Sequence, residues 1–314
     1  MANSEAIAGV HSFLLYKKET AFNTAVVADT HFGIVKSFTP KSSNTNTYSR
    51  GFKGTTTGGR AVAKILPGKA EFTSSVEFDV VNWAFLEFVL GTVAGSDPYT
   101  YTMAALPSSF TLVRSIDNPG GSATDRDEIW SGSVINSATI KVAVGEPVSV
   151  SLEIMSAGHM FDTTIHSAVA LPSVDVYSFA GADIELPNAT ALDNIIDSME
   201  ITITNNFKAI GGLGDRRAKN MLPEGLDYKI KFSVKYLDNT LLEYLLGAAE
   251  PGATTTPTEN ATIECNFVNG DKSAKLLFTT FTFDDISGKE NVTEAIGEDL
   301  SGTAVSLTVT EDNT

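Results

Sequence analysis

Apolar and polar residues alternate strictly from residue 71 to residue 80. This alternation predicts a half-buried strand, because successive side chains of a strand point to opposite faces. The segment that follows has apolar residues at helical spacing, with Asn82 at the N-cap position and Gly91 at the end. The apolar face of the predicted strand consists of Phe72, Val76, Phe78 and Val80.

This strand and helix pattern recurs 156 residues later. Leu66-Pro67 matches Leu222-Pro223, and LEFVLG at residues 86–91 matches LEYLLG at residues 242–247. Apolar residues match apolar residues between these markers, without a gap. We therefore predict a tandem duplication, with domains at residues 1–160 and 161–314 and the boundary between Met155 and Ser178.

Each half contains further segments with the period-two pattern of strands. The predicted class is mainly β, with two tandem β-sandwich or barrel domains, each carrying one short flanking helix and a long polar loop. The further strands are Ile129–Val144, Val148–Ile154, Met199–Asn206, Thr262–Phe267, Ala274–Phe283 and Ala304–Thr310.

The two predicted polar loops are Thr39–Arg60 and Asn205–Arg217. Loops of this length inside a compact domain are uncommon and are usually functional or disordered. Their equivalent position in both halves favours contacts with a neighbouring subunit. The candidate contact residues are Tyr48, Arg50, Phe52, Arg60, Asn205, Phe207, Arg216 and Arg217.

Composition narrows the possible functions. The chain has 314 residues, 42% of them hydrophobic, and a net charge of -16 from 22 basic and 38 acidic residues. It can bury a core, and its acidity excludes a protein that grips nucleic acid by overall charge. The sequence lacks a run of ~18 apolar residues and a signal peptide, so we expect no membrane partner and synthesis in a reducing cytosol.

Catalytic and cofactor motifs are not found in the sequence. The single Cys265 excludes an internal disulfide and a cysteine-based zinc site, and His159 and His166 make a weak metal pair. We therefore predict no enzyme activity, no cofactor and no metal. One acidic cluster has the oxygen-rich composition of a calcium site, although a solvated loop explains it better: Asp117, Asp125, Asp127 and Glu128.

The order of elements, occurring twice, resembles tail tube proteins of tailed viruses. The segments that carry the resemblance are Gly58–Gly91 and Asn205–Gly247, with Ile129–Ile154 in support. The resemblance implies six units per ring and rings stacked into a hollow tube through which viral DNA is ejected. Two units per chain then imply trimeric, pseudo-hexameric rings of a long-tailed virus.

The resemblance also implies a virion protein made in the host cytoplasm. Its partners would be other copies of itself, tape measure, tail terminator and baseplate or tip proteins, and DNA transiently and non-specifically in the lumen. The alternative is another virion or surface β-sandwich, such as a capsid-decoration or receptor-binding module. That alternative explains the duplication and the missing catalytic motifs equally well.

Charges on the matched strands suggest a ring interface. The strand face that carries Glu77 and Asp79 in the first copy corresponds to a face that carries Lys231 and Lys235 in the second, so unlike faces could adjoin around a ring. A wall that faces DNA should not grip phosphates. The polar positions of two late strands fit this requirement and are candidates for the lumen: Ser149, Ser151, Glu153, Ser306, Thr308 and Thr310.

Overall fold

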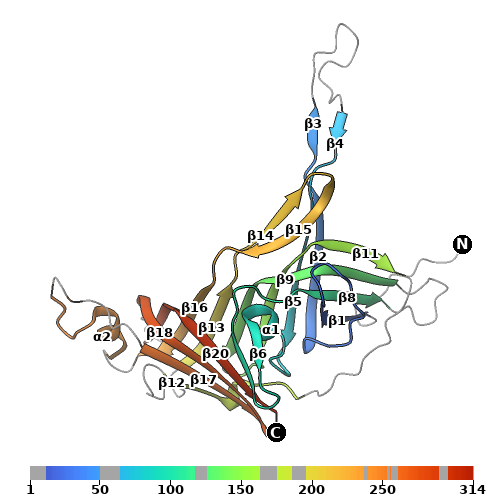
Figure 1. The fold of residues 1–314 in the computed structure, drawn as a ribbon. Coiled ribbons are helices and arrows are strands. Elements are labelled where there is room, and N and C mark those ends of the chain that lie inside the picture. Colours follow the sequence, from blue (N-terminus) through green and yellow to red (C-terminus); the bar gives the residue numbers. More distant parts are fainter. Residues whose placement is uncertain are drawn as a thin grey trace, which may run out of the picture.

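The computed structural model describes residues 12–49, 64–116, 126–162, 175–185, 196–236, 240–252, 255, 261–289 and 296–313. The fold is mainly β, as predicted, and most strands belong to one continuous 16-stranded sheet. This sheet folds into a large central layer and two flanking layers that share strands with it (Figure 1). We call β1 to β11 the first half of the chain and β12 to β20 the second half.

The central layer contains four strands from each half, and every neighbouring pair is antiparallel. Strands β9 and β13 join the two halves in its middle, with Lys141 opposite Glu200. In spatial order, the strands are β2 (Ile34–Asn44), β5 (Ala70–Asp79), β10 (Ser149–Ser156), β9 (Arg126–Ala143), β13 (Ile196–Thr204), β16 (Asp227–Lys235), β19 (Gly297–Ala304) and β18 (Lys272–Lys289).

Strands β9 and β18 are 18 residues long, and each continues from the central layer into a flanking layer. The beginning of β9 pairs with β8 (Phe110–Ile116) and β11 (Gly158–Asp162), and β8 pairs with β1 (Ser12–Lys18). The beginning of β18 pairs with β17 (Ala261–Asn269) and β20 (Ser306–Asp312). The second flanking layer is completed by β12 (Ala182–Glu185), which pairs with β17, and by β7 (Tyr99–Met103) and β6 (Gly91–Ala94) beside β20.

One hydrophobic cluster fills the space between the central and flanking layers, and it contains residues of both halves. In β5, Val76 and Phe78 are buried and Glu77 between them is exposed, as the predicted alternation requires. In β16, Phe232 is buried in the same cluster. Apolar burial on this scale, at about 25 cal/mol per Å², is the main stabilising contribution to the fold.

The first helix, α1 (Leu86–Leu90), begins later than predicted. Asn82 does not cap it but closes a preceding turn, since its Oδ1 accepts a hydrogen bond from the Ala84 N–H at 3.1 Å. The end was predicted correctly: Gly91 has a φ of 104°, a left-handed conformation that glycine adopts most easily. The second helix, α2 (Thr240–Leu246), lies at the far end of the second half (Figure 1). Asp238, which the repeat places at the position equivalent to Asn82, is outside the described residues.

Two hairpins extend from the same end of the molecule, upward in Figure 1. The first is β3 (Thr47–Ser49) with β4 (Lys64–Leu66), and the second is β14 (Phe207–Gly212) with β15 (Asp215–Pro223). The second predicted polar loop is therefore a paired hairpin. Its pairing is favoured because one of its faces packs apolar side chains onto the body of the protein.

One further predicted strand is divided in the structure. The segment Ala304–Thr310 is not one strand, because β19 ends at Ala304 and β20 begins at Ser306. Val305 between them is 71% exposed, at the corner where the chain passes from the central layer to the flanking layer. A short 3₁₀ helix, η2 (Phe179–Gly181), precedes β12.

Candidate functional site: the polar face of the central layer

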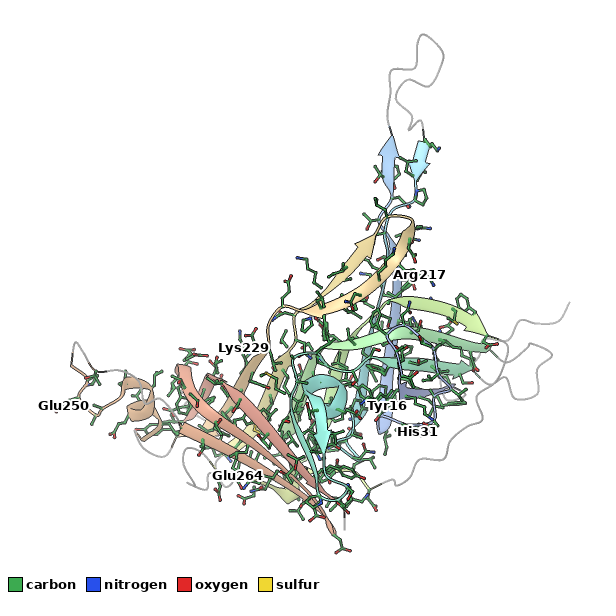
Figure 2. The ribbon with its side chains drawn as sticks, viewed as in Figure 1. Tyr16, His31, Arg217, Lys229, Glu250 and Glu264 are labelled. Atoms are coloured by element: carbon green, nitrogen blue, oxygen red, sulfur yellow. The ribbon has the colours of Figure 1, made fainter. Side chains whose placement is uncertain are left out.

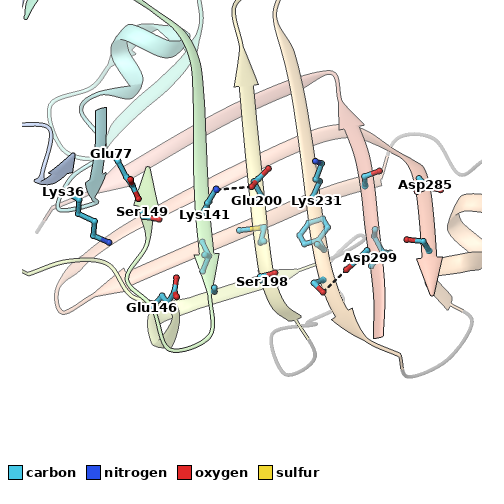
Figure 3. Close-up of a pocket in the computed structure, with 18 residues that line it drawn as sticks. Lys36, Glu77, Lys141, Glu146, Ser149, Ser198, Glu200, Lys231, Asp285 and Asp299 are labelled. Atoms are coloured by element: carbon cyan, nitrogen blue, oxygen red, sulfur yellow. Dashed lines mark hydrogen bonds and ion pairs between the residues drawn. The ribbon is translucent and has the colours of Figure 1, made fainter. Parts of the chain in front are cut away.

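The face of the central layer that points away from the core is polar across almost its whole width. One row of aligned residues crosses seven neighbouring strands and contains only charged residues and serines. Figure 3 shows most of this row from the open side of the sheet. In order from β5 to β18, the row is Asp79, Ser149, Lys141, Glu200, Lys231, Ser301 and Asp285.

Several lysines on this face lie beside carboxylates of the same chain. Lys141 Nζ is 3.5 Å from Glu200 Oε2, a contact that spans the junction of the two halves. Glu200 also lies directly opposite Lys231 on its other side. Both side chains of the Lys141–Glu200 pair are more than a third exposed, so the pair contributes at most about 1 kcal/mol. The surface therefore mixes both signs of charge in a shallow hollow.

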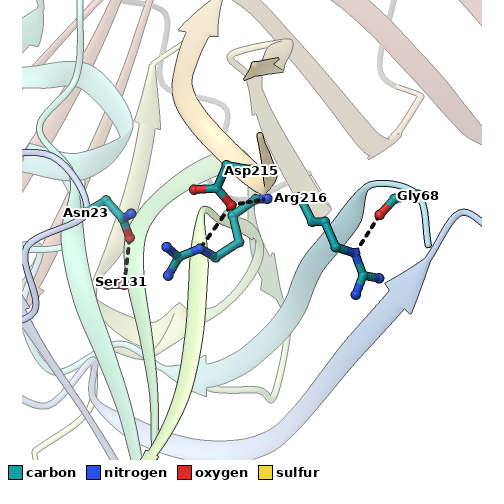
Figure 4. Close-up of polar contacts among 6 residues, drawn as sticks. Asn23, Gly68, Ser131, Asp215 and Arg216 are labelled. Atoms are coloured by element: carbon teal, nitrogen blue, oxygen red, sulfur yellow. Dashed lines mark hydrogen bonds and ion pairs between the residues drawn. The ribbon is translucent and has the colours of Figure 1, made fainter. Parts of the chain in front are cut away.

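The second hairpin contacts the base of the first. Arg216 on β15 donates from Nε to the Gly68 carbonyl oxygen at 2.8 Å (Figure 4). It also donates from an Nη nitrogen to Asn44 Oδ1 at 2.8 Å. Gly68 packs closely against the backbone of Thr45. Only glycine fits at this position, because a Cβ would lie 1.5 Å from the Thr45 carbonyl oxygen. The two hairpins are thus held together at the end of β2.

A family model described as phage tail tube protein matches residues 9–310. The chain belongs to the phage tail tube protein family. A search of curated proteins finds no match. The match spans nearly the whole chain, and it confirms the resemblance to tail tube proteins of tailed viruses that was inferred from the sequence.

Residues predicted to line the lumen of the tail tube lie in two different places. Ser149, Ser151 and Glu153 are on β10, on the polar face of the central layer. The triplet Ser306, Thr308 and Thr310 is on β20, which pairs with β18 and β7 in a flanking layer. In the first half, β10 pairs with β5. In the second half, the corresponding partner of β16 is β19 and not β20.

The charges predicted for a ring interface also lie on the polar face, and each has a partner in its own half. Asp79 is 2.6 Å from Lys36 on β2, and Lys235 is 3.2 Å from Asp197 on β13. Glu77 is next to Ser37, and Lys231 is opposite Glu200. Within one chain, Lys231 and Lys235 therefore lie beside Glu200 and Asp197. The contact between unlike faces around a ring stays a prediction.

The predicted arm residues divide into exposed and buried ones. Tyr48 is 56% exposed on the first hairpin. Arg216 and Arg217 are exposed on the second (Figures 2 and 4), where Arg217 is 3.4 Å from Asp215. Asn205 and Phe207 are buried at the junction between the halves of the same chain. Arg50, Phe52 and Arg60 lie outside the described residues.

Phe207 belongs to a small separate cluster that attaches the second hairpin to the first half. Its neighbours there include Val134 of β9 and Met221 of β15. This contact explains why the predicted loop is a hairpin fixed to the body. Sequence periodicity could not reveal it, because the buried positions of the hairpin alternate over only a few residues.

A buried carboxylate was missed by the sequence analysis. Glu19 is 7% exposed and accepts hydrogen bonds from Ser109 Oγ at 2.7 Å and Thr111 Oγ1 at 3.0 Å. It also accepts from the backbone N–H groups of Asn23 at 2.9 Å and Gly132 at 2.8 Å. Four donors compensate for the burial of this charge, and they give Glu19 a structural role. An isolated glutamate in a sequence carries no signal of such a network.

Candidate chemistry elsewhere is limited. Cys265 is buried, and its burial raises the pKa of the thiol above its usual range. No group of three or more potential metal ligands occurs among the described residues. Asp117 and Asp125 of the acidic cluster, and His166, lie outside the described residues. His159 instead stacks on Trp130 with ring centroids 4.8 Å apart. Within the described parts of the chain, no helix is long and apolar enough to span a membrane.

Proposed function

We propose that three copies of this tail tube protein form a ring, and that stacked rings form the hollow tube through which viral DNA is ejected. The observation that carries the proposal is the open, eight-stranded central layer with one polar face. An open sheet whose edges remain unpaired is a template for pairing with another chain, and closing it into a barrel removes the edges.

The tandem duplication remains a proposal, and three sets of counterparts support it. β9 and β18 carry bulges 148 positions apart, at Asn136 and Asp284. β2 and β13 carry bulges 161 positions apart, after Val35 and Ile196. Gly132 and Thr280, again 148 positions apart, have positive φ values of 59° and 54°. Positive φ at a β-branched residue is rare, so a shared ancestral backbone explains Thr280 better than chance.

Duplication also predicts how copies would pair. Inside the chain, β9 pairs with β13. The counterpart of β9 is β18 and the counterpart of β13 is β2, and these two strands form the edges of the central layer. Transferring the internal register places Ser43 of one copy opposite Asp285 of the next, and Lys41 opposite Ser287. Asp285 and Lys41 would then be diagonal neighbours of opposite charge.

Edge strand β2 carries Pro40, which has no N–H to donate to a neighbour. Pro40 corresponds to Ile201 on β13, which pairs with β9 inside the chain. The pairing of β2 with β18 of the next copy would therefore have one ladder hydrogen bond fewer than the pairing of β13 with β9. Proline and lysine on an edge oppose indiscriminate strand pairing. These residues fit a protein that must stay unassembled until tail assembly begins.

The polar face is our proposed lumen wall. DNA that slides along it meets serines, threonines and lysines that lie beside carboxylates, such as Lys141 beside Glu200. Paired lysines grip phosphates less strongly than free ones, which reduces friction during ejection. Of the predicted lumen residues, the proposal keeps Ser149, Ser151 and Glu153 and places the triplet Ser306, Thr308 and Thr310 outside the bore.

The two hairpins extend from one end of the sheet, so we propose that they contact the adjacent ring (Figure 1). Exposed Tyr48 on the first hairpin and Leu213 at the tip of the second, which is fully exposed, are suited to such contacts. Tail terminator and baseplate or tip proteins would meet the same surfaces at the ends of the tube, and the tape measure protein would meet the lumen.

Cysteine cross-linking tests the proposed ring. The variant with Ser43→Cys and Asp285→Cys should form disulfides between copies and give covalently closed trimers under oxidising conditions. Native Cys265 is buried and should not interfere. The control combines Thr39→Cys with Asp285→Cys and is out of register by four residues, so it should cross-link poorly. Closed hexamers, or equal cross-linking of both variants, would contradict the proposal.

A further inference from the structure

A knot of hydrogen bonds joins the two halves where β9 meets the end of β13. Asn136, the bulged residue of β9, accepts two of them: its carbonyl oxygen from the Asn205 N–H and its Oδ1 from the Phe207 N–H, both at 2.8 Å. Asn205 Nδ2 donates to the carbonyl oxygens of Ile135 at 2.9 Å and Val89 of α1 at 3.0 Å. At 2% exposure, Asn205 is buried in this knot.

The accepting side of this knot has a counterpart at one free edge of the chain. Asp284 is the bulged residue of β18 and lies 148 positions after Asn136. The carbonyl of Phe283 corresponds to that of Ile135, and Leu245 of α2 corresponds to Val89. The Asp284 side chain is exposed and accepts a hydrogen bond from Thr303 Oγ1 at 2.6 Å.

The donating side has its counterpart at the other free edge. Asn44 is the last residue of β2 and lies 161 positions before Asn205, the same offset that relates the bulges of β2 and β13. Asn44 is exposed, and Arg216 binds its Oδ1 at 2.8 Å. This contact orients the side-chain amide and does not use its Nδ2 donor.

We propose that Asn44 of one copy and Asp284 of the next form the same knot between subunits. Asn44 Nδ2 would donate to the carbonyls of Phe283 and Leu245, and its backbone N–H to the carbonyl of Asp284. The Asn46 N–H, the counterpart of that of Phe207, would donate to the Asp284 carboxylate. This inference rests on the proposed ring and names the residues that lock it.

The intersubunit knot would contain a carboxylate, from Asp284, where the internal knot contains the side-chain amide of Asn136. A carboxylate is an acceptor only, so it suits a backbone N–H, and a charged acceptor makes a stronger hydrogen bond than an amide. The knot would also draw α2 against the neighbouring copy, because Leu245 belongs to that helix. Arg216 would contribute indirectly by holding Asn44 in place.

Matched alanine variants test the inference in the full chain. Asn205→Ala removes the internal knot and should lower the melting temperature of the unassembled protein. Asn44→Ala removes only one exposed hydrogen bond inside the chain, from Arg216, and should lower that melting temperature much less than Asn205→Ala. It should raise the concentration needed for ring assembly by on the order of tenfold, because two intersubunit hydrogen bonds are lost. Asn313→Ala, near the end of the described chain, is the control and should change neither quantity.

A second pair of variants examines the other side of the knot. Asp284→Asn keeps an acceptor and should assemble, whereas Asp284→Lys should not, although both should stay folded. If wild-type protein forms three-chain rings and Asn44→Ala and Asp284→Lys assemble equally well, the knot is wrong and the ring stands. Wild-type rings of six chains would instead overturn the ring stoichiometry and the knot that depends on it.

Discussion

The two helices have the same apolar pattern but are buried to different extents. In α1, the side chains of Leu86, Val89 and Leu90 are fully buried. In α2, their counterparts Leu242 and Leu245 are partly exposed, and Leu246 is 37% exposed. Helix α1 lies in the middle of the molecule and α2 at one end, close to Glu250 in Figure 2.

Residues of the second half of the chain cover the region around α1, which would otherwise be exposed to solvent. Trp83, just before α1, stacks on Phe267 of β17 with ring centroids 5.4 Å apart. Its backbone N–H donates to Glu311 of β20 at 3.1 Å, and the Tyr101 hydroxyl donates to the same carboxylate at 2.8 Å. Helix α1 is therefore buried by a second unit that lies beside it. Under our proposal, the next copy of the ring supplies that unit to α2.

The largest effect is expected from Leu86→Asp. A charge without a partner in this fully buried position should cost several kcal/mol and unfold the protein, as measured by thermal denaturation followed by circular dichroism. Leu242→Asp is the matched control, since its side chain is partly exposed and the charge can reach water. Equal destabilisation by both changes would contradict the asymmetry between the helices.

Glu311→Ala should have the next largest effect, because it leaves the Trp83 N–H and the Tyr101 hydroxyl without their acceptor. Loss of a buried charged acceptor costs about 1–3 kcal/mol, measurable by urea denaturation. Thr310→Ala, on the same strand with its side chain on the opposite face, should change stability by less than about 0.5 kcal/mol. A Glu311→Ala protein as stable as wild type would show that β20 does not secure α1.

Alkaline pH should weaken the same junction. Burial, and to a smaller extent the charge of Glu311, raises the pKa of Tyr177 to about 12 from its usual 10.0. Because the folded pKa is the higher one, the contribution is complete below pH 10 and is lost as the pH rises toward 12, with about 1 kcal/mol lost at pH 11. Tyr177→Phe should reduce the difference in unfolding free energy between pH 9 and 11. An unchanged difference would contradict this assignment.

The ion pair between Lys141 and Glu200 should matter little for folding. A double-mutant cycle with Lys141→Ala and Glu200→Ala should give a coupling energy of 0 to about 1 kcal/mol, decreasing with added salt. A larger, salt-independent coupling would mean that the junction of the halves relies on this pair. In the assembled tube, we expect Glu200→Ala to slow DNA release at low salt, because it leaves Lys141 free to bind phosphate.

Leu246→Asp should have the smallest effect on the isolated protein, within about 0.5 kcal/mol of wild type, since the side chain is already partly in water. It should nevertheless prevent tube formation, as seen by negative-stain microscopy, because the charge would be buried against the next copy. Normal tubes from this variant would show that the exposed face of α2 stays exposed after assembly.

Local pattern predicted much of the fold, and long-range pairing accounts for what it missed. The alternation in β5 and the glycine that ends α1 both depend on neighbouring residues, and both were predicted correctly. A period-two pattern shows which face of a strand is buried but not which strand lies beside it. The pairing of β9 with β13 into one sheet therefore had no signature in the sequence.

The candidate site was predicted only in part for a related reason. The lumen candidates were placed on β10 and β20 as equivalent late strands, whereas the strand pairing makes β19 the equivalent of β10. Leu300, Gly302 and Ala304 form the buried face of β19, and two of these residues are too small to stand out in an apolar pattern. The residues of the proposed knot, Asn44 and Asp284, become visible only when both bulges are aligned.

A cryo-electron microscopy reconstruction of the assembled tube would test the ring, the strand pairing and the lumen wall together. We predict three chains per ring, with β2 of one copy paired to β18 of the next and Ser151 facing the bore. Six chains per ring, or Ser151 on the outer surface of the tube, would contradict it.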